Sequence, residues 1–230
     1  MSASAILFDL DGTLTDPKLG ITRCIRFALS ELGQKSPDAD ELHWCIGPPI
    51  KDSFSLLLNT SDDTVLAQAI SLYRSRFATI GLFENSLYPQ ILETLDAICF
   101  AGYRIFVATS KPHIYATRIV EHFGLSSFFD GVYGSELDGS RSVKSELIHH
   151  ILVTEQLSPA AVVMVGDRSH DIIGAKRNSI TAMGVTYGYG TEEELKKNGA
   201  DLIVHTPDEI ARLLIDGYEL RLETHVKCKN

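Results

Sequence analysis

The stretch 6-ILFDLDGTLTD-16 places two aspartates, Asp9 and Asp11, directly behind a short apolar run. Aspartate is uncommon in strands, and two like charges this close repel each other. Residues two apart in an extended chain face the same way, so we expect both carboxylates to project together from the end of a strand. Gly12 permits the sharp turn that follows. The stretch therefore predicts a strand end at which two carboxylates face a cation.

Four further apolar runs resemble the first strand, which we expect over residues 5–8. They occupy residues 104–108, 161–165, 182–185 and 202–204. Their near-continuous apolar character is typical of strands that are covered on both faces. The segments between them carry helical periodicity. This alternation predicts an α/β fold with a doubly wound parallel sheet, whose chemistry gathers at the carboxyl ends of the strands.

One region breaks the alternation, because residues 17–83 contain no strand pattern. Helices are expected over residues 19–33 and 62–80, with a shorter one between them. We therefore predict a core domain formed by residues 1–16 and 84–230, and a second, smaller all-helical cap domain at residues 17–83. The mixed-charge tail from Tyr218 is expected to fray.

The chemistry of two adjacent carboxylates suggests phosphoryl transfer. One carboxylate can accept a phosphoryl group covalently, and the other can donate a proton to the leaving group and later take one from water. Mg²⁺, which prefers oxygen ligands, would relieve their repulsion. A calcium loop would need a preceding helix and a glutamate at its twelfth position, where this chain has Gly20. A simple turn after the strand remains an alternative.

Two more strand ends carry polar side chains. Thr109 and Ser110 follow the second predicted strand, where hydroxyls before a helix can form an anion site or an ordinary helix cap. Asp167 and Asp171 follow the third, after Gly166. Because parallel strands end at the same edge of a sheet, these groups are expected to meet Asp9 and Asp11.

These motifs resemble the haloacid dehalogenase superfamily, in particular its phosphatases with a helical cap inserted after the first strand. The signature DxDGTLxD is met by residues 9–16, the second motif by Thr109 and the fourth, GDxxxD, by residues 166–171. The third motif is a lysine, to which we assign Lys144. Serine follows it where many relatives have proline, and Arg141 is the alternative. The whole pattern is similar to phosphoglycolate phosphatases and 5'-nucleotidase-like enzymes.

The resemblance implies a site and a mechanism. Asp9 would attack phosphorus and form an aspartyl-phosphate, while Asp11 would act as general acid and then as base. Mg²⁺ would be held by Asp9, by Asp11 through its backbone carbonyl, and by Asp167, with Asp171 close by. The groups implied in binding the phosphoryl oxygens are Thr109, Ser110, Lys144 and Gly12. An acid at position 11 argues against dehalogenation, since a leaving halide needs no proton.

The expected activity is Mg²⁺-dependent hydrolysis of a small phosphomonoester such as phosphoglycolate, a nucleotide or a sugar phosphate. A phosphomutase of the β-phosphoglucomutase type and a non-catalytic phosphate-binding module are the alternatives. The cap is expected to set substrate choice. Its stiff turn at Gly47, Pro48 and Pro49, followed by Lys51, could point at the core site.

Composition limits the other possibilities. The net charge of the 230-residue chain is −9, from 21 basic and 30 acidic residues, and no dense basic cluster suggests a nucleic-acid or membrane-surface protein. The four cysteines have no zinc-ligand spacing and are expected to be free thiols: Cys24, Cys45, Cys99 and Cys228. No apolar run approaches the roughly 18 residues that a membrane helix needs, and no signal peptide is evident, so we expect a cytoplasmic monomer or homodimer that acts on a small phosphorylated metabolite.

Overall fold

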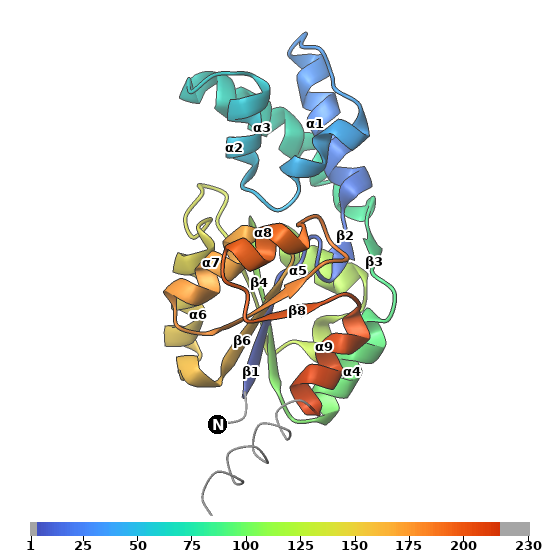
Figure 1. Cartoon of the computed structure of the whole chain (residues 1–230). Coiled ribbons are helices and arrows are strands. Elements are labelled where there is room, and N and C mark those ends of the chain that lie inside the picture. Colours follow the sequence, from blue (N-terminus) through green and yellow to red (C-terminus); the bar gives the residue numbers. More distant parts are fainter. Residues whose placement is uncertain (1–3, 217–230) are drawn as a thin grey trace, which may run out of the picture.

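The computed structural model describes residues 4–216 of the chain. The tail from Tyr218, with Cys228, lies outside the described residues, and Cys24, Cys45 and Cys99 are free thiols as expected. The main sheet is built from β1 (Ala5–Phe8), β4 (Arg104–Pro112), β5 (Gly131–Ser135), β6 (Val162–Gly166), β7 (Thr181–Val185) and β8 (Leu202–Val204). All neighbours pair in parallel, in the order β5-β4-β1-β6-β7-β8 (Figure 1).

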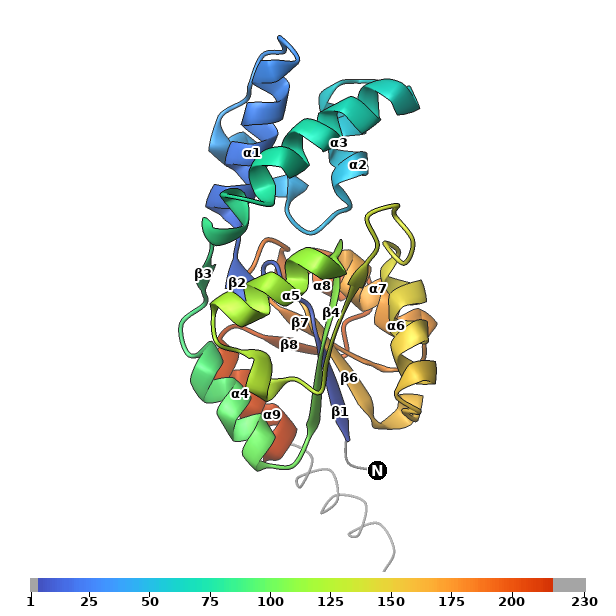
Figure 2. The same ribbon diagram turned by 180° about the vertical axis from the view of Figure 1, so that it is seen from behind.

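Helices cover both faces of this sheet. Ile6 and Phe8 of β1 pack into one hydrophobic cluster, and Ala5 and Leu7 into another, as the alternation of side chains along a strand requires. The first cluster includes residues of α4 (Ile91–Phe100), α5 (His113–His122) and α9 (Pro207–Ile215). The second includes residues of α6 (Lys144–Thr154), α7 (Ser169–Arg177) and α8 (Glu192–Lys197) (Figures 1 and 2). The predicted doubly wound fold is confirmed.

The register of the sheet brings three strand ends together. Phe8, at the end of β1, lies opposite Val107 of β4 and Val165 of β6. The residue after each of these, Asp9 among them, therefore stands at the same edge of the sheet. The polar residues that follow β1 and β6, and those in the later part of β4, are thus brought to one place by strand pairing alone.

The strand predictions need correction at several places. β4 continues to Pro112 rather than ending at residue 108, because its later residues still lie beside β5. β5 is absent from the sequence prediction, and so are the two-residue strands β2 (Thr15–Asp16) and β3 (Ser86–Leu87). β5 is an edge strand whose first three residues are only partly buried, and its sequence, GVYGS, lacks the continuous apolar pattern of the inner strands.

A helical insert lies beyond the carboxyl edge of the sheet (Figure 2). It contains α1 (Lys18–Glu31), α2 (Ile50–Leu57) and α3 (Asp63–Phe77), with short 3-10 helices at Ala39–Cys45 and Gly81–Phe83. An antiparallel ribbon of β2 (Thr15–Asp16) and β3 (Ser86–Leu87) joins it to the sheet. The insert is all-helical, as expected, and its division from the core at residues 17 and 83 stays a prediction.

The helices of the insert form because their apolar residues recur on one face. In α1, Ile21, Cys24 and Ile25 are buried, and in α3, Leu66 and Tyr73 are buried with helical spacing. All of them belong to the hydrophobic cluster that also contains Phe8 of the sheet. The insert is therefore packed onto the core.

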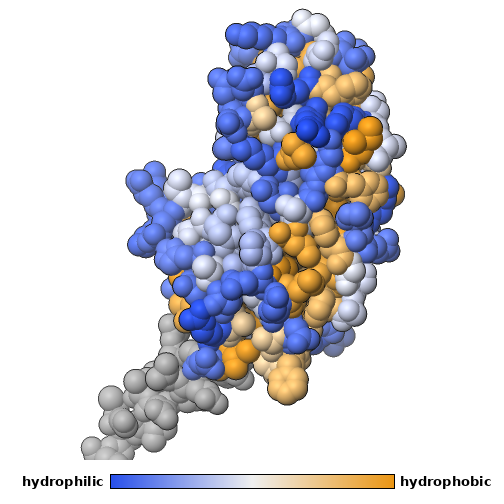
Figure 3. Space-filling model, turned by 90° about the vertical axis from the view of Figure 1, so that its right-hand side faces the viewer, coloured by the Kyte–Doolittle hydropathy of each residue, from blue (hydrophilic) through white to orange (hydrophobic). Residues whose placement is uncertain are grey.

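Part of the surface is apolar. Figure 3 shows hydrophobic residues in a band that continues from the helical insert onto the core. Large apolar side chains with substantial exposure include Leu19, Phe83, Leu92 and Phe100. Single exposed apolar residues are ordinary on globular proteins. Among residues 4–216, no helix has the length and apolar character needed to cross a membrane.

Candidate active site

The turn after β1 holds Asp9 and Asp11 below the helical insert. The Asp9 N–H donates to the carbonyl of Val165 at 2.9 Å, which continues the pairing of β1 with β6 by one residue. Both aspartates are buried, with exposed fractions of 4% and 7%. Gly12 has φ +91°, and a Cβ at this position would lie 2.2 Å from Asp167 Oδ2. Glycine is thus needed both for the turn and for the close approach of Asp167.

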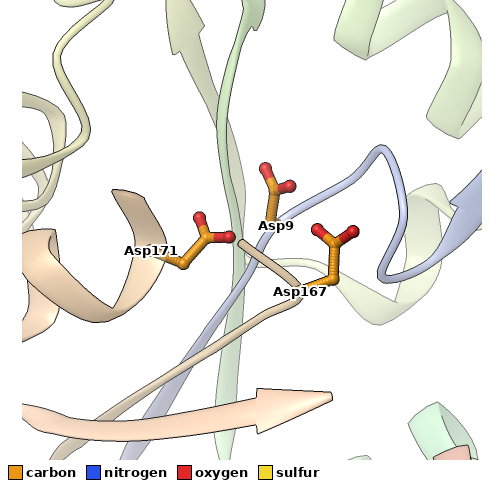
Figure 4. A group of neighbouring side chains, drawn as sticks. All are labelled: Asp9, Asp167 and Asp171. Atoms are coloured by element: carbon orange, nitrogen blue, oxygen red, sulfur yellow. The ribbon is translucent and has the colours of Figure 1, made fainter. Parts of the chain in front are cut away.

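Three carboxylates from separate segments meet at this turn. Asp9, Asp167 and Asp171 each place an oxygen within 4.8 Å of the others. Figure 4 shows the three neighbouring side chains. All three are buried. Gly166 makes this possible, because a Cβ there would lie 2.3 Å from Asp171 Cγ. The structure therefore brings together three of the four aspartates predicted as metal ligands.

The fourth aspartate points elsewhere. Asp11 Oδ2 lies 2.8 Å from Lys111 Nζ, and Asp11 does not belong to the group of three. A role of Asp11 in metal binding through its backbone carbonyl stays a prediction. Its side chain is instead available to the pocket, which both Asp9 and Asp11 line.

The crowding of the three carboxylates changes their acidity. Burial raises the pKa of Asp9 to about 6, with Lys144 opposing the shift and Asp171 adding to it. Burial, followed by the charges of Asp171 and Asp9, raises the pKa of Asp167 well above its ordinary value. Asp167 Oδ1 is also buried without a hydrogen-bond partner. A buried, unsatisfied carboxylate oxygen beside two like charges is costly, so the group favours binding of a cation.

One cation from the chain already lies in the group. Lys144 Nζ is 2.8 Å from Asp9 Oδ1 and 2.7 Å from Asp171 Oδ1, and it donates to the carbonyl of Ala108 at 2.8 Å. Burial alone would lower the pKa of Lys144, but the charges of Asp171 and Asp9 outweigh it and raise the pKa. Arg141, the alternative, pairs with Glu136 instead. The structure therefore places Lys144 between the carboxylates of Asp9 and Asp171, whereas Arg141 pairs with neither of them.

Thr109 and Ser110 line the same pocket. They lie within the extended part of β4, and α5 begins only at His113 after Pro112. A helix does follow this stretch, as expected, but the two hydroxyls lie within the strand rather than at the helix N-terminus, and they reach the site from there. Thr109 is buried, and its Oγ1 accepts a hydrogen bond from the Lys111 N–H at 3.2 Å.

Two parts of the site are missing from the sequence prediction. Lys111 pairs with Asp11, and its Nζ lies 4.4 Å from the ring centroid of Phe77, which belongs to α3 of the insert. A cation above an aromatic face is attracted to it. The TSKP stretch is visible in the sequence, but nothing in it indicates that Lys111 would meet both a signature aspartate and the insert.

The loop after β7 is the second missing part. The Tyr189 N–H donates to Asp167 Oδ2 at 2.7 Å, and the Tyr187 hydroxyl donates to the carbonyl of Thr13 at 3.0 Å. At Gly188, a Cβ would lie 2.2 Å from the carbonyl oxygen of Gly12. No residue of this loop is among the predicted site residues, whereas the structure packs it against the signature turn.

The helical insert forms the opposite wall of the pocket. The space amounts to about 600 Å³, including the part that is open to solvent. The insert contributes the predicted turn and one face of α3 to this wall: Gly47, Pro48, Pro49, Ile50, Tyr73, Arg74 and Phe77. The carbonyl of Ile46, just before the turn, accepts a hydrogen bond from Arg168 Nη1 at 2.7 Å. The turn therefore lies against the core site.

Lys51 does not lie in this inner pocket. Its Nζ is 2.9 Å from Asp63 Oδ1, and its side chain is 58% exposed. It lines a larger outer groove that also reaches Arg74, Ser110 and Lys144. The cation of the insert that lines the inner pocket is Arg74, which lines the outer groove as well.

The geometry agrees with a family comparison. Residues 6–185 match the model of haloacid dehalogenase-like hydrolases. The chain belongs to the haloacid dehalogenase-like hydrolase family. The match spans the signature turn, the insert, β4, Lys144 and the GDxxxD motif, which are the parts that meet at the site.

Individual relatives support the same assignment. The chain is 47% identical to a 5'-nucleotidase of Pseudomonas aeruginosa over 83% of this chain and 86% of that protein. It is 37% identical to the tyrosine-protein kinase PtkA of Mycobacterium tuberculosis over 93% of this chain and 73% of that protein. A phosphoglycolate phosphatase of Colwellia psychrerythraea is 26% identical over 89% of this chain and 94% of that protein.

Among solved structures, a "predicted phosphatase" from Clostridium acetobutylicum superposes with a TM-score of 0.90 at 38% identity, covering 94% of this chain and all of that one. The predicted resemblance to haloacid dehalogenase phosphatases and the predicted enzyme class, a phosphoric monoester hydrolase, are therefore confirmed.

Proposed function

We propose that the protein is a Mg²⁺-dependent phosphatase that hydrolyses a small phosphomonoester through an aspartyl-phosphate on Asp9. The observation that carries this proposal is that two carboxylates, those of Asp9 and Asp11, line the same pocket. Each is paired with its own lysine, Asp9 with Lys144 and Asp11 with Lys111. The two carboxylates occupy different surroundings, so they can take different roles.

Asp9 is suited to attack phosphorus. Its Oδ1 accepts a hydrogen bond from Lys144, and no hydrogen bond from the described residues reaches its Oδ2. Oδ2 is therefore the oxygen available to form a bond to phosphorus, while Lys144 keeps the carboxylate oriented.

Asp11 is suited to proton transfer. It would donate a proton to the leaving-group oxygen and then take one from the water that hydrolyses the aspartyl-phosphate. Lys111 of β4 fixes the position of the Asp11 carboxylate, with its Nζ 2.8 Å from Asp11 Oδ2. A phosphate ester with an alkoxide leaving group needs this proton, which is why a second acid accompanies the nucleophile.

The donor set fits Mg²⁺. Asp9, Asp167 and Asp171 supply carboxylate oxygens within 4.8 Å of one another, without histidine or cysteine, and Asp167 Oδ1 lacks a partner. Bound Mg²⁺ would supply the positive charge that offsets repulsion between these carboxylates and a phosphate group. Asp11 would join them through its backbone carbonyl.

Thr109, Ser110, Lys144 and the amide of Gly12 would bind the phosphoryl oxygens. Lys144 would in addition stabilise the negative charge that grows on these oxygens in the transition state. The substrate would be a phosphoglycolate, nucleotide or sugar phosphate, in keeping with the names of the 5'-nucleotidase and phosphoglycolate phosphatase relatives.

A phosphate-release screen over these three substrate classes tests the proposal. We expect Mg²⁺-dependent release, and borohydride reduction during turnover should trap the acyl phosphate within the peptide that contains Asp9. Isomerisation of a sugar phosphate without net phosphate release would instead identify a mutase. Release that persists after complete chelation of divalent ions would refute the metal dependence.

A further inference from the structure

Arg74 stands where the inner pocket meets the outer groove. It lies on α3 of the insert and lines both spaces. The inner pocket contains Asp9 and Asp11, and the outer groove runs between the insert and the core segment at residues 135–144. A molecule that extends from the candidate active site toward solvent along this groove therefore passes the Arg74 side chain.

The guanidinium of Arg74 has few partners. Its Nη2 donates to the backbone carbonyl of Leu137 at 2.9 Å. Its Nε is buried and has no hydrogen-bond partner, and no ion pair to Arg74 is found among residues 4–216. Arg76, two residues further along α3, is by contrast bound to both carboxylate oxygens of Glu84 at 2.7 and 3.1 Å.

The other cations near Arg74 are already paired within the protein. Lys111 lies 2.8 Å from Asp11, and Lys51 lies 2.9 Å from Asp63. The wall of the inner pocket around Arg74 is otherwise largely aromatic and apolar, with Tyr73, Phe77 and Ile50 among its residues. Arg74 is thus the cation of this wall that lacks a carboxylate partner among the described residues.

A buried donor without an acceptor is costly, and a ligand that supplies the acceptor recovers that free energy. The planar guanidinium matches the two oxygens of a carboxylate or a phosphate. α3 lies across the pocket from the ends of β1 and β4, whose residues hold the phosphoryl group in the proposed reaction. An anion at Arg74 would therefore belong to the leaving group.

We propose that Arg74 binds an anionic group on the leaving-group side of the substrate, so that preferred substrates are phosphomonoesters with a second carboxylate or phosphate. This inference rests on the proposed phosphatase function and specifies its substrate class. It assigns recognition of this anionic group to Arg74 rather than to Lys51. It also predicts that a phosphomonoester with an uncharged leaving group is a poorer substrate.

Non-hydrolysable analogues test the proposal by binding rather than turnover. 3-Phosphonopropionate carries a phosphonate and a carboxylate, and propylphosphonate has the same shape with a methyl group in place of the carboxylate. With Mg²⁺ present, we expect the wild-type protein to bind the carboxylate analogue at least about tenfold more tightly, which corresponds to about 1.4 kcal/mol. Arg74→Met should abolish this preference, and Arg74→Lys should keep part of it.

Lys51→Met is the matched control, since it removes another cation of the insert that lines only the outer groove. It should leave the preference unchanged. Turnover of phosphoglycolate against ethyl phosphate, and of propane-1,3-diyl bisphosphate against 3-hydroxypropyl phosphate, then shows whether the anion is a carboxylate or a phosphate.

Two results would overturn the inference. If Arg74→Met weakened both phosphonates equally, Arg74 would act only through its contact with Leu137. If the wild-type protein bound both phosphonates equally, or preferred nucleoside monophosphates irrespective of residue 74, no second anion would be recognised there. Failure of the phosphatase function itself looks different, because no ester would then release phosphate, whichever phosphonate the protein binds more tightly.

Discussion

Lys144 Nζ lies 2.8 Å from Asp9 Oδ1 although the two residues are 135 positions apart in the chain. Lys144 is the first residue of α6, and it also reaches Asp171 on α7 at 2.7 Å. A single buried ammonium group therefore holds carboxylates from two different elements. Removing it would leave two buried like charges facing each other.

The first prediction follows from this relationship. Lys144→Met should lower kcat/KM by about 10²–10³-fold, the usual effect of removing one donor that stabilises transition-state charge. It should also lower the melting temperature in metal-free buffer, since breaking a buried ion pair typically costs about 3–5 kcal/mol. Arg141→Met, which removes a cation paired with Glu136, should change neither property. Equal effects of both substitutions would contradict the assignment of Lys144.

The second prediction concerns Asp9. Asp9→Asn should abolish turnover, because an amide cannot form the acyl phosphate. The metal-free protein should keep its melting temperature or gain a few degrees, since burial raises the pKa of Asp9 to about 6 and thus already disfavours its charge. Phosphate release and thermal unfolding of the same preparation measure the two effects. Substantial activity in a folded variant would exclude Asp9 as the nucleophile.

The third prediction separates proton transfer from positioning at Asp11. Asp11→Asn should slow hydrolysis of an alkyl phosphate by about 10²–10⁴-fold, the usual contribution of a general acid. Hydrolysis of p-nitrophenyl phosphate should fall much less, because nitrophenolate leaves without a proton. Asp16→Asn is the control, since Asp16 hydrogen-bonds Tyr189 and should affect both substrates alike. Equal losses in Asp11→Asn would assign Asp11 a positioning role.

The fourth prediction concerns Mg²⁺ and pH. The folded-state pKa of Asp9 is raised from 3.8 to about 6, so between these values the folded protein keeps a proton that the unfolded chain has lost. The stability contributed by this proton is present at low pH and is lost as the pH rises through about 6. Protons and Mg²⁺ compete for the same carboxylates. Mg²⁺ should therefore raise the melting temperature more at pH 7.5 than at pH 5.

Thermal unfolding at both pH values, with and without MgCl₂, measures this difference. Asp167→Asn should reduce the Mg²⁺-induced rise at pH 7.5, because Asp167 supplies an oxygen to the group of three. An equal rise at both pH values would place the bound cation elsewhere.

Much of the fold could be predicted from the sequence because most strands carry a short continuous apolar run. β1, β6, β7 and β8 begin and end within one residue of their expected positions. β5 could not be found in the same way, because GVYGS has no such run, whereas β8, at the opposite edge of the sheet, consists of the apolar residues LIV. The two longer helices of the insert, α1 and α3, were predictable because one face of each is apolar, whereas α2 (Ile50–Leu57) was not predicted as a helix separate from the short one before it.

The site was predictable where a residue lies in a local motif directly after an apolar run, as Asp9, Thr109 and Asp167 do. Lys111 and Arg74 carry no such signal. Their importance depends on how α3 sits above the sheet, which no pattern within TSKP or within α3 encodes. The prediction for Lys51 illustrates the same limit, since it followed a distinctive turn but pairs with Asp63.

Arg168 occupies the position directly after Asp167, yet its guanidinium fastens the insert through the carbonyl of Ile46. The backbone that presents a carboxylate to the group of three therefore also carries the side chain that ties the insert to the core. Any displacement of the turn after Ile46 away from the sheet would have to break this hydrogen bond. The position of the pocket wall and the position of Asp167 thus depend on neighbouring residues of one short segment.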